Sequence, residues 1–155
     1  MKGSLHIDPI ITALIPHRPP FLWVDTIISY ENGAIVTEKT IPEDLDIFKG
    51  HYPDHPILPG VILCEALFQT GALLIARMVQ DALEKEPTKS GIPVLSRIGG
   101  ARFRRPVGPG STLQMQVKLK EKIAEAWFLK GVLRVKEKIA VQVDFSCTMT
   151  QALQP

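Results

Sequence analysis

The fold is decided by the stretch GHYPDHPILPG, residues 50–60, and by the apolar run VILCEALFQTGALLIA, residues 61–76, that follows it. Three prolines keep the first part in a loop. The second part stays apolar over about four helical turns, which predicts a helix buried on most of its circumference. We expect this helix to run from about Gly60 to Val79, or as far as Leu83. The run is too short and too interrupted to predict a membrane span.

The polar side chains of this run are Glu65, Gln69 and Thr70. Glu65 and Gln69 stand four residues apart, so they share one face of the helix and can form a hydrogen bond. A carboxyl group in such an apolar helix is costly unless it is paired or protonated. This cost is the first indication that the helix carries chemistry.

The composition is that of a soluble globular protein with a single domain, residues 1–155. Apolar residues make up 45% of the chain and charged residues 22%, which is ordinary for that class. The net charge of +2 is too small to indicate binding to nucleic acid or to an anionic membrane. Cys64 and Cys147 lie in apolar surroundings, which favours buried thiols over a disulfide or a zinc site. The first residues form no apolar signal segment, so we expect a cytoplasmic protein.

The segments around the helix predict mostly strands. Asp8 can cap a short helix from Pro9 to Leu14, and a hairpin follows, with strands at 21–29 and 34–40 around a turn at 31–33. After the long helix, alternating patterns predict strands at 94–103, 113–120, 127–135 and 141–150. Two strands, one buried helix and four more strands predict an α+β fold. In it an antiparallel sheet of about six strands wraps around one long central helix.

Three separated motifs resemble those of one family. The element GHYPxxPxxPGV at 50–61, followed by EAxxQ at 65–69, is similar to the signature of FabZ-type (3R)-hydroxyacyl-acyl-carrier-protein dehydratases. The segment IPHRxPFLxVD at 15–25 resembles the family's amino-terminal motif, and ARFRRPVxPG at 101–110 resembles its later one. The strand around FxKGV at 128–132 also fits. The resemblance covers nearly the whole chain and implies the hotdog fold, which agrees with the order of elements above.

The resemblance places the catalytic pair on His51 and Glu65, with no metal or organic cofactor. A neutral histidine suits the removal of a weakly acidic α-proton near neutral pH. A buried, protonated carboxyl can help the β-hydroxyl leave as water. The free N–H groups of Gly60 and Val61 at the helix start can stabilise the thioester oxygen, and Gly60 lets the substrate approach closely. We expect Gln69 to orient Glu65.

The resemblance also implies partners. The family builds its site across a homodimer interface, with the histidine from one subunit and the carboxylate from the other. A hexamer, formed as a trimer of such dimers, is a further possibility. The substrate arrives on an acyl carrier protein, which is acidic, so a local basic patch should receive it. The candidates for that patch are Arg102, Arg104, Arg105 and Lys130, although charges on strand edges often serve only solubility. No nucleic-acid or membrane partner is expected.

Several alternatives stay open. A hotdog thioesterase, an isomerising dehydratase or a non-catalytic hotdog subunit that binds a carrier protein would share many of these residues. Relatives that also isomerise usually carry aspartate at the position of Glu65, and a structural subunit has no need of a buried acid. We expect His17 to be structural, bonding the backbone near its turn, and His55 to be a surface residue. The segment RIGGA at 97–101, Pro93 and Asp54 depart from the family pattern, so acyl chain length and pathway are not determined.

Overall fold

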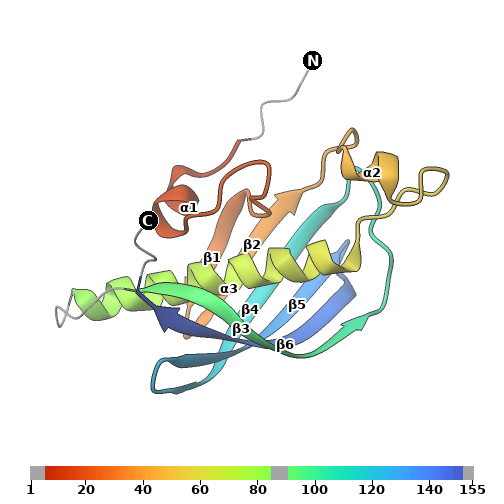
Figure 1. The fold of residues 1–155 in the computed structure, drawn as a ribbon. Coiled ribbons are helices and arrows are strands. Elements are labelled where there is room, and N and C mark those ends of the chain that lie inside the picture. The colour runs from red at the N-terminus through yellow and green to blue at the C-terminus, as the bar shows by residue number, and fades with distance from the viewer. Residues whose placement is uncertain (1–5, 85–90, 152–155) are drawn as a thin grey trace.

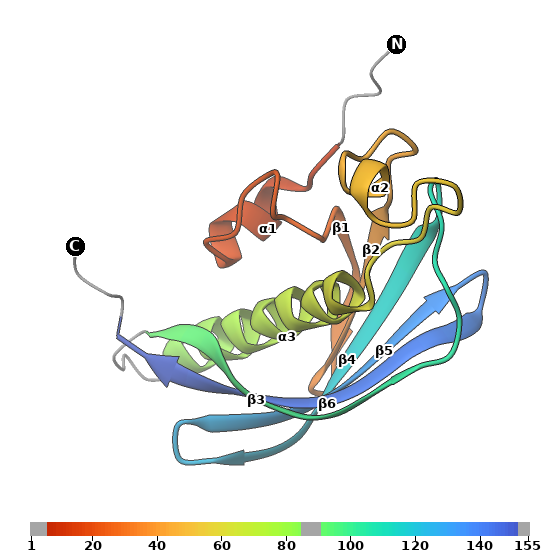
Figure 2. The same cartoon turned by 45° about the vertical axis from the view of Figure 1, so that its right-hand side comes forward.

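The computed structural model describes residues 6–84 and 91–151, which form a curved antiparallel sheet wrapped around one long helix (Figures 1 and 2). The six strands lie in the order β1-β2-β4-β5-β6-β3. This is the α+β hotdog architecture predicted from the sequence. Before the long helix come α1 (Pro9–Leu14), β1 (Thr26–Glu31), β2 (Ala34–Thr40) and α2 (Ile47–Gly50); after it come β3 (Ile92–Phe103), β4 (Thr112–Ile123), β5 (Ala126–Val135) and β6 (Lys138–Thr150).

The long helix α3 (Gly60–Leu83) is the core of the molecule. Nearly every side chain from Leu63 to Ile75 is buried, on all sides of the helix. Two glycines let the helix approach the sheet closely. A Cβ on Gly71 would lie 2.8 Å from Cζ of Phe145, and one on Gly131 of β5 would lie 3.2 Å from Cδ2 of Leu67. The predicted buried helix is confirmed, and it extends to Leu83.

The expectation that this segment is too short for a membrane span was wrong. The helix has 24 residues and a mean hydropathy of 1.6 over an 18-residue window, so its length and composition would allow a span. Burial favours a core helix over a span, because 61% of the window lies inside the fold. The apolar character of α3 is therefore used in packing against the sheet.

The two cysteines are buried, free thiols, as predicted. Cys64 lies on α3 and Cys147 on β6, and both belong to the apolar core. Burial raises the pKa of Cys64, and it raises that of Cys147 to about 12, with a smaller contribution from the nearby Glu65 carboxylate. Both groups therefore stay protonated near neutral pH and act as small apolar side chains.

The first strand begins later than the pattern of residues 21–29 predicted. β1 starts at Thr26, and the segment before it is extended but lies outside the sheet ladder. The backbone N–H of Trp23 donates to the side chain of Gln69 at 2.8 Å, so it is not available to a neighbouring strand. The prediction failed here because a side chain of α3 replaces the strand partner.

A buried ion pair anchors the end of this segment to the sheet. Nζ of Lys39 on β2 lies 2.7 Å from Oδ1 of Asp25, and the two side chains are only 6% and 14% exposed. The other carboxylate oxygen of Asp25 accepts the backbone N–H of Thr40 at 2.9 Å. The exposed pair of Lys49 and Asp46 has nearly the same separation, 2.6 Å, with side chains 80% and 90% exposed.

Because of this difference in burial, we expect Asp25→Ala to destabilise the protein by about 3–5 kcal/mol, since it leaves a buried ammonium group without its partner. The matched change Asp46→Ala should leave the unfolding midpoint where it is, because exposed pairs contribute little. Denaturant unfolding monitored by circular dichroism measures both. The double variant Asp25→Ala/Lys39→Met should recover much of the loss. Equal effects of the two single alanine variants would contradict the role assigned to the buried pair.

Candidate active site

The carboxyl of Glu65 is held by Gln69, as the spacing predicted. Gln69 is 1% exposed, and its Nε2 donates to Oε1 of Glu65 at 2.9 Å and to the carbonyl of Phe21 at 2.9 Å. Its own Oε1 accepts the Trp23 N–H at 2.8 Å. Because a backbone N–H can only donate, this bond fixes which end of the amide faces Glu65. Glu65 therefore receives a donor of known orientation.

The ring of His51 is oriented by the loop that follows it. His51 ends α2, and its Nδ1 lies 2.8 Å from the carbonyl oxygen of Ile57. A carbonyl can only accept, so the ring donates from Nδ1 and the neutral ring has a free lone pair on Nε2. The backbone of Tyr52 has a positive φ of 54°. Its ring packs edge-on against the ring of His51, with the two ring centroids 4.6 Å apart. This geometry suits a general base.

The start of α3 offers free donors. Pro59 provides no side-chain cap, and within the described part of the chain the N–H groups of Gly60 and Val61 have no acceptor. Such groups in the first helical turn are suited to an anionic oxygen. Gly60 also has a packing reason that the sequence did not reveal. A Cβ there would lie 2.8 Å from Cε1 of Phe103, so the ring of Phe103 occupies the space that a side chain at position 60 would need.

His17 lies beside Glu65, which the sequence analysis did not anticipate. Its Nε2 is 3.8 Å from Oε1 of Glu65, and its Nδ1 is buried without a hydrogen-bond partner among the described residues. Burial lowers the pKa of His17; Glu65 raises it and Arg18 lowers it, both to a smaller extent. The expected bond from the His17 ring to the backbone is not formed; Arg18 bonds the backbone at this turn.

The two predicted catalytic side chains are not in contact within one chain. Among the described residues His17, and not His51, lies within ion-pair distance of Glu65. The described residues also contain no group of three His, Cys, Asp or Glu side chains that could hold a metal ion. One chain thus presents an oriented acid on α3 and an oriented histidine in the loop before it.

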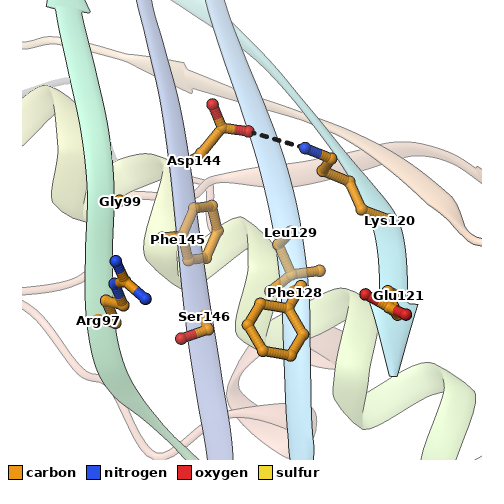
Figure 3. Close-up of a pocket in the computed structure, with 9 residues that line it drawn as sticks. All are labelled: Arg97, Gly99, Lys120, Glu121, Phe128, Leu129, Asp144, Phe145 and Ser146. Atoms are coloured by element: carbon orange, nitrogen blue, oxygen red, sulfur yellow. Dashed lines mark ion pairs between the residues drawn. The ribbon is translucent and has the colours of Figure 1, made fainter. Parts of the chain in front are cut away.

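The predicted docking residues gather on the outer face of the sheet. Arg102 and Lys130 line one groove with Asp144 and Gln142, and Nε of Arg104 donates to Oε1 of Gln142 at 3.0 Å. Arg105 is exposed in the segment after β3. A cavity of about 240 Å³ adjoins the groove, and Figure 3 shows the residues that line it, on strands β3 to β6. Groove and cavity share Gly99 and Asp144.

Comparison with known proteins identifies the family. A FabA-like domain matches residues 15–144, a range that includes His51, Glu65 and most of the sheet. The chain belongs to the FabA-like family. Curated relatives named "3-hydroxyacyl-[acyl-carrier-protein] dehydratase FabZ" include one from Anaeromyxobacter dehalogenans strain 2CP-1, 38% identical over 136 residues, or 87% of this chain and 85% of the relative. The relative from Polaromonas naphthalenivorans is 40% identical over 140 residues, or 90% and 94%. The FabZ-type resemblance is therefore confirmed.

Solved structures of this family's fold agree with the architecture. The dehydratase heterocomplex ApeI:P from Xenorhabdus doucetiae is similar with a TM-score of 0.75 and 17% identity, over 92% of this chain and 91% of that one. The uncharacterized protein PH1136 from Pyrococcus horikoshii has a TM-score of 0.63 and 14% identity, over 97% of both chains. At these identities the similarity shows the hotdog fold alone.

Proposed function

We propose that this protein, as a single hotdog domain, converts (3R)-3-hydroxyacyl thioesters on acyl carrier protein to trans-2-enoyl thioesters in fatty-acid or related lipid biosynthesis. Such a substrate would place the enzyme in the cytoplasm. The observation that carries the proposal is the Glu65 carboxyl, held by Gln69 in an otherwise apolar helix of a FabZ-type chain. His51 is the base and Glu65 the acid, and the proposed chemistry uses no cofactor.

The two residues divide the elimination between them. Nε2 of His51 accepts the α-proton, and the electron pair of that C–H bond becomes the new double bond. Negative charge that gathers on the thioester oxygen meets the N–H groups of Gly60 and Val61. Glu65 gives its proton to the β-hydroxyl as the carbon–oxygen bond breaks, and water leaves. Transfer of one proton from His51 to Glu65 then restores the starting state.

Exposed apolar side chains support a site shared between two copies of the chain. β3 is an edge strand that pairs only with β6, yet Val94, Leu95, Ile98 and Phe103 on it are exposed. Tyr52 and Val61, beside the predicted site, are 61% and 73% exposed. An uncovered apolar edge is an aggregation hazard, so a partner surface is expected to cover it. A second copy there would bring another His51 and Glu65, and further dimers would build a hexamer.

For the reaction itself, we expect His51→Asn and Glu65→Gln each to lower kcat by roughly 10²–10⁴-fold, the range for loss of a general acid or base. The ultraviolet absorbance of the enoyl thioester follows the rate, and His55→Gln serves as the control histidine because His55 is exposed and outside the proposed site. Activity retained by His51→Asn would contradict the proposal. Release of free acid in place of enoyl product would identify a thioesterase.

Mixing the two inactive variants tests the shared site. In a mixed dimer one site loses both groups and the other keeps both, so co-refolded His51→Asn and Glu65→Gln chains should regain activity. Random pairing makes half of the dimers mixed, and each has one intact site. Recovery is measured against each variant refolded alone. A mixture as inactive as its components would show that both groups act within one chain.

The groove on the outer sheet face supports docking of an acidic carrier protein. Lys130 on β5 lies directly opposite Lys118 on β4, and both are exposed. Like charges in this arrangement are unfavourable, and an acidic surface would relieve them. Arg97, Arg102 and Lys120 add positive charge along the groove and cavity, where Asp144 pairs with Lys120 at 3.5 Å (Figure 3). Arg97 and Gly99 are two of the positions where the chain departs from the family pattern.

We expect Lys130→Glu to raise KM for the carrier-bound substrate about tenfold, as loss of one rim charge contact allows. The same variant should leave kcat/KM for an N-acetylcysteamine thioester unchanged, because that substrate needs no docking. Lys138→Glu, an equal charge change six residues from Asp144 along β6, is the matched control. Equal effects of Lys130→Glu and Lys138→Glu, or an equal loss with both substrates, would contradict docking in the groove.

A further inference from the structure

His17 is a partly buried titratable group that the proposed reaction does not use, although it lies against the proposed acid, Glu65. It lies after α1, in the segment between Ile15 and Pro20. Nε2 of His17 and Nε2 of Gln69 both lie near the same atom, Oε1 of Glu65, at 3.8 Å and 2.9 Å. The other oxygen, Oε2, has no hydrogen-bond partner among the described residues.

The backbone around His17 is fixed by its neighbour. The guanidinium group of Arg18 donates to three carbonyl groups, those of Thr12, Ile15 and His17, each at 2.8 Å. These bonds join the end of α1 to the turn that carries His17. The histidine therefore faces Glu65 from a defined position, although it lies far from Glu65 in the sequence.

The surroundings determine which ring nitrogen carries the proton. Burial and Arg18 lower the pKa of His17, so the ring is neutral near pH 7 and has one N–H. Nδ1 is buried without a partner among the described residues. A buried N–H without an acceptor is the more costly arrangement, so the hydrogen belongs on Nε2, which faces the carboxyl. The contact needs to shorten by roughly 1 Å to become a hydrogen bond, and active-site contacts often tighten when substrate binds.

We propose that His17 is a positioning residue for Glu65: with Gln69 it occupies Oε1, so that the acidic proton lies on Oε2 and faces the substrate. This inference rests on the dehydratase function proposed above. Two donors directed at Oε1 leave no room for a hydrogen on that atom, whereas Oε2 is free to carry it. His17 thereby determines which oxygen protonates the departing hydroxyl, and it does not itself touch the reacting atoms.

The test compares two substitutions of His17 on two carrier-free substrates. The amide nitrogen of glutamine can reach the position of Nε2, whereas that of asparagine corresponds to Nδ1. The substrates are the N-acetylcysteamine thioesters of a 3-hydroxyacyl and a 3-chloroacyl chain, since chloride leaves without a proton. His17→Asn should lower kcat for the hydroxy substrate roughly 100-fold, the cost of a misplaced catalytic group, with KM unchanged. His17→Gln should keep most of the activity.

The chloro substrate separates positioning from a general structural role. Both variants should eliminate chloride at the wild-type rate, because His51 still removes the α-proton. Equal losses with both substrates, or a fall in thermal stability that matches the loss of activity, would overturn the proposal and make His17 structural. Wild-type activity of His17→Asn on the hydroxy substrate would also overturn it. Failure of the unaltered protein to dehydrate the 3-hydroxyacyl thioester would instead contradict the proposed function.

Discussion

One buried amide, the side chain of Gln69, joins the core of this protein to its site. It lies on the most buried part of α3, donates to Glu65 and to the carbonyl of Phe21, and accepts the N–H of Trp23. Each of these groups would be costly to bury without a partner. The same side chain therefore stabilises the segment before β1 and orients the acid. The packing of this segment and the proposed chemistry thus depend on the same three hydrogen bonds.

The sheet around α3 is well packed inside and incomplete at its margins. Buried residues alternate with exposed or partly exposed ones at 113–117 of β4 and 127–133 of β5, and glycines at 71 and 131 allow close approach of helix and sheet. At β3, by contrast, apolar side chains remain exposed along an open edge, and its last residue, Phe103, lies against Gly60 at the start of α3. A single chain is thus stable in its core, while the surfaces around its site have the character of an interface.

Electrostatic features divide between the two faces of the sheet. On the inner side, the Asp25–Lys39 pair is almost fully buried, and polar groups in such surroundings need partners. On the outer side, lysines and arginines line a groove in which exposed charges meet solvent and like charges face each other. The small net charge of +2 gives no indication of this local cluster of positive side chains. Local arrangement, more than total charge, determines which partner such a surface suits.

Most of the fold could be predicted from the sequence, because strand and helix periodicities are local. The apolar run at 61–76 determined the central helix, the alternation in β4 and β6 determined the sheet, and the spacing of Glu65 and Gln69 determined their hydrogen bond. Motifs in the right order also determined the family. The sequence alone did not determine the start of β1, the ring of Phe103 over Gly60 or the place of His17. Each of these depends on side chains distant in sequence that only packing around α3 brings together, and no periodicity records such a contact.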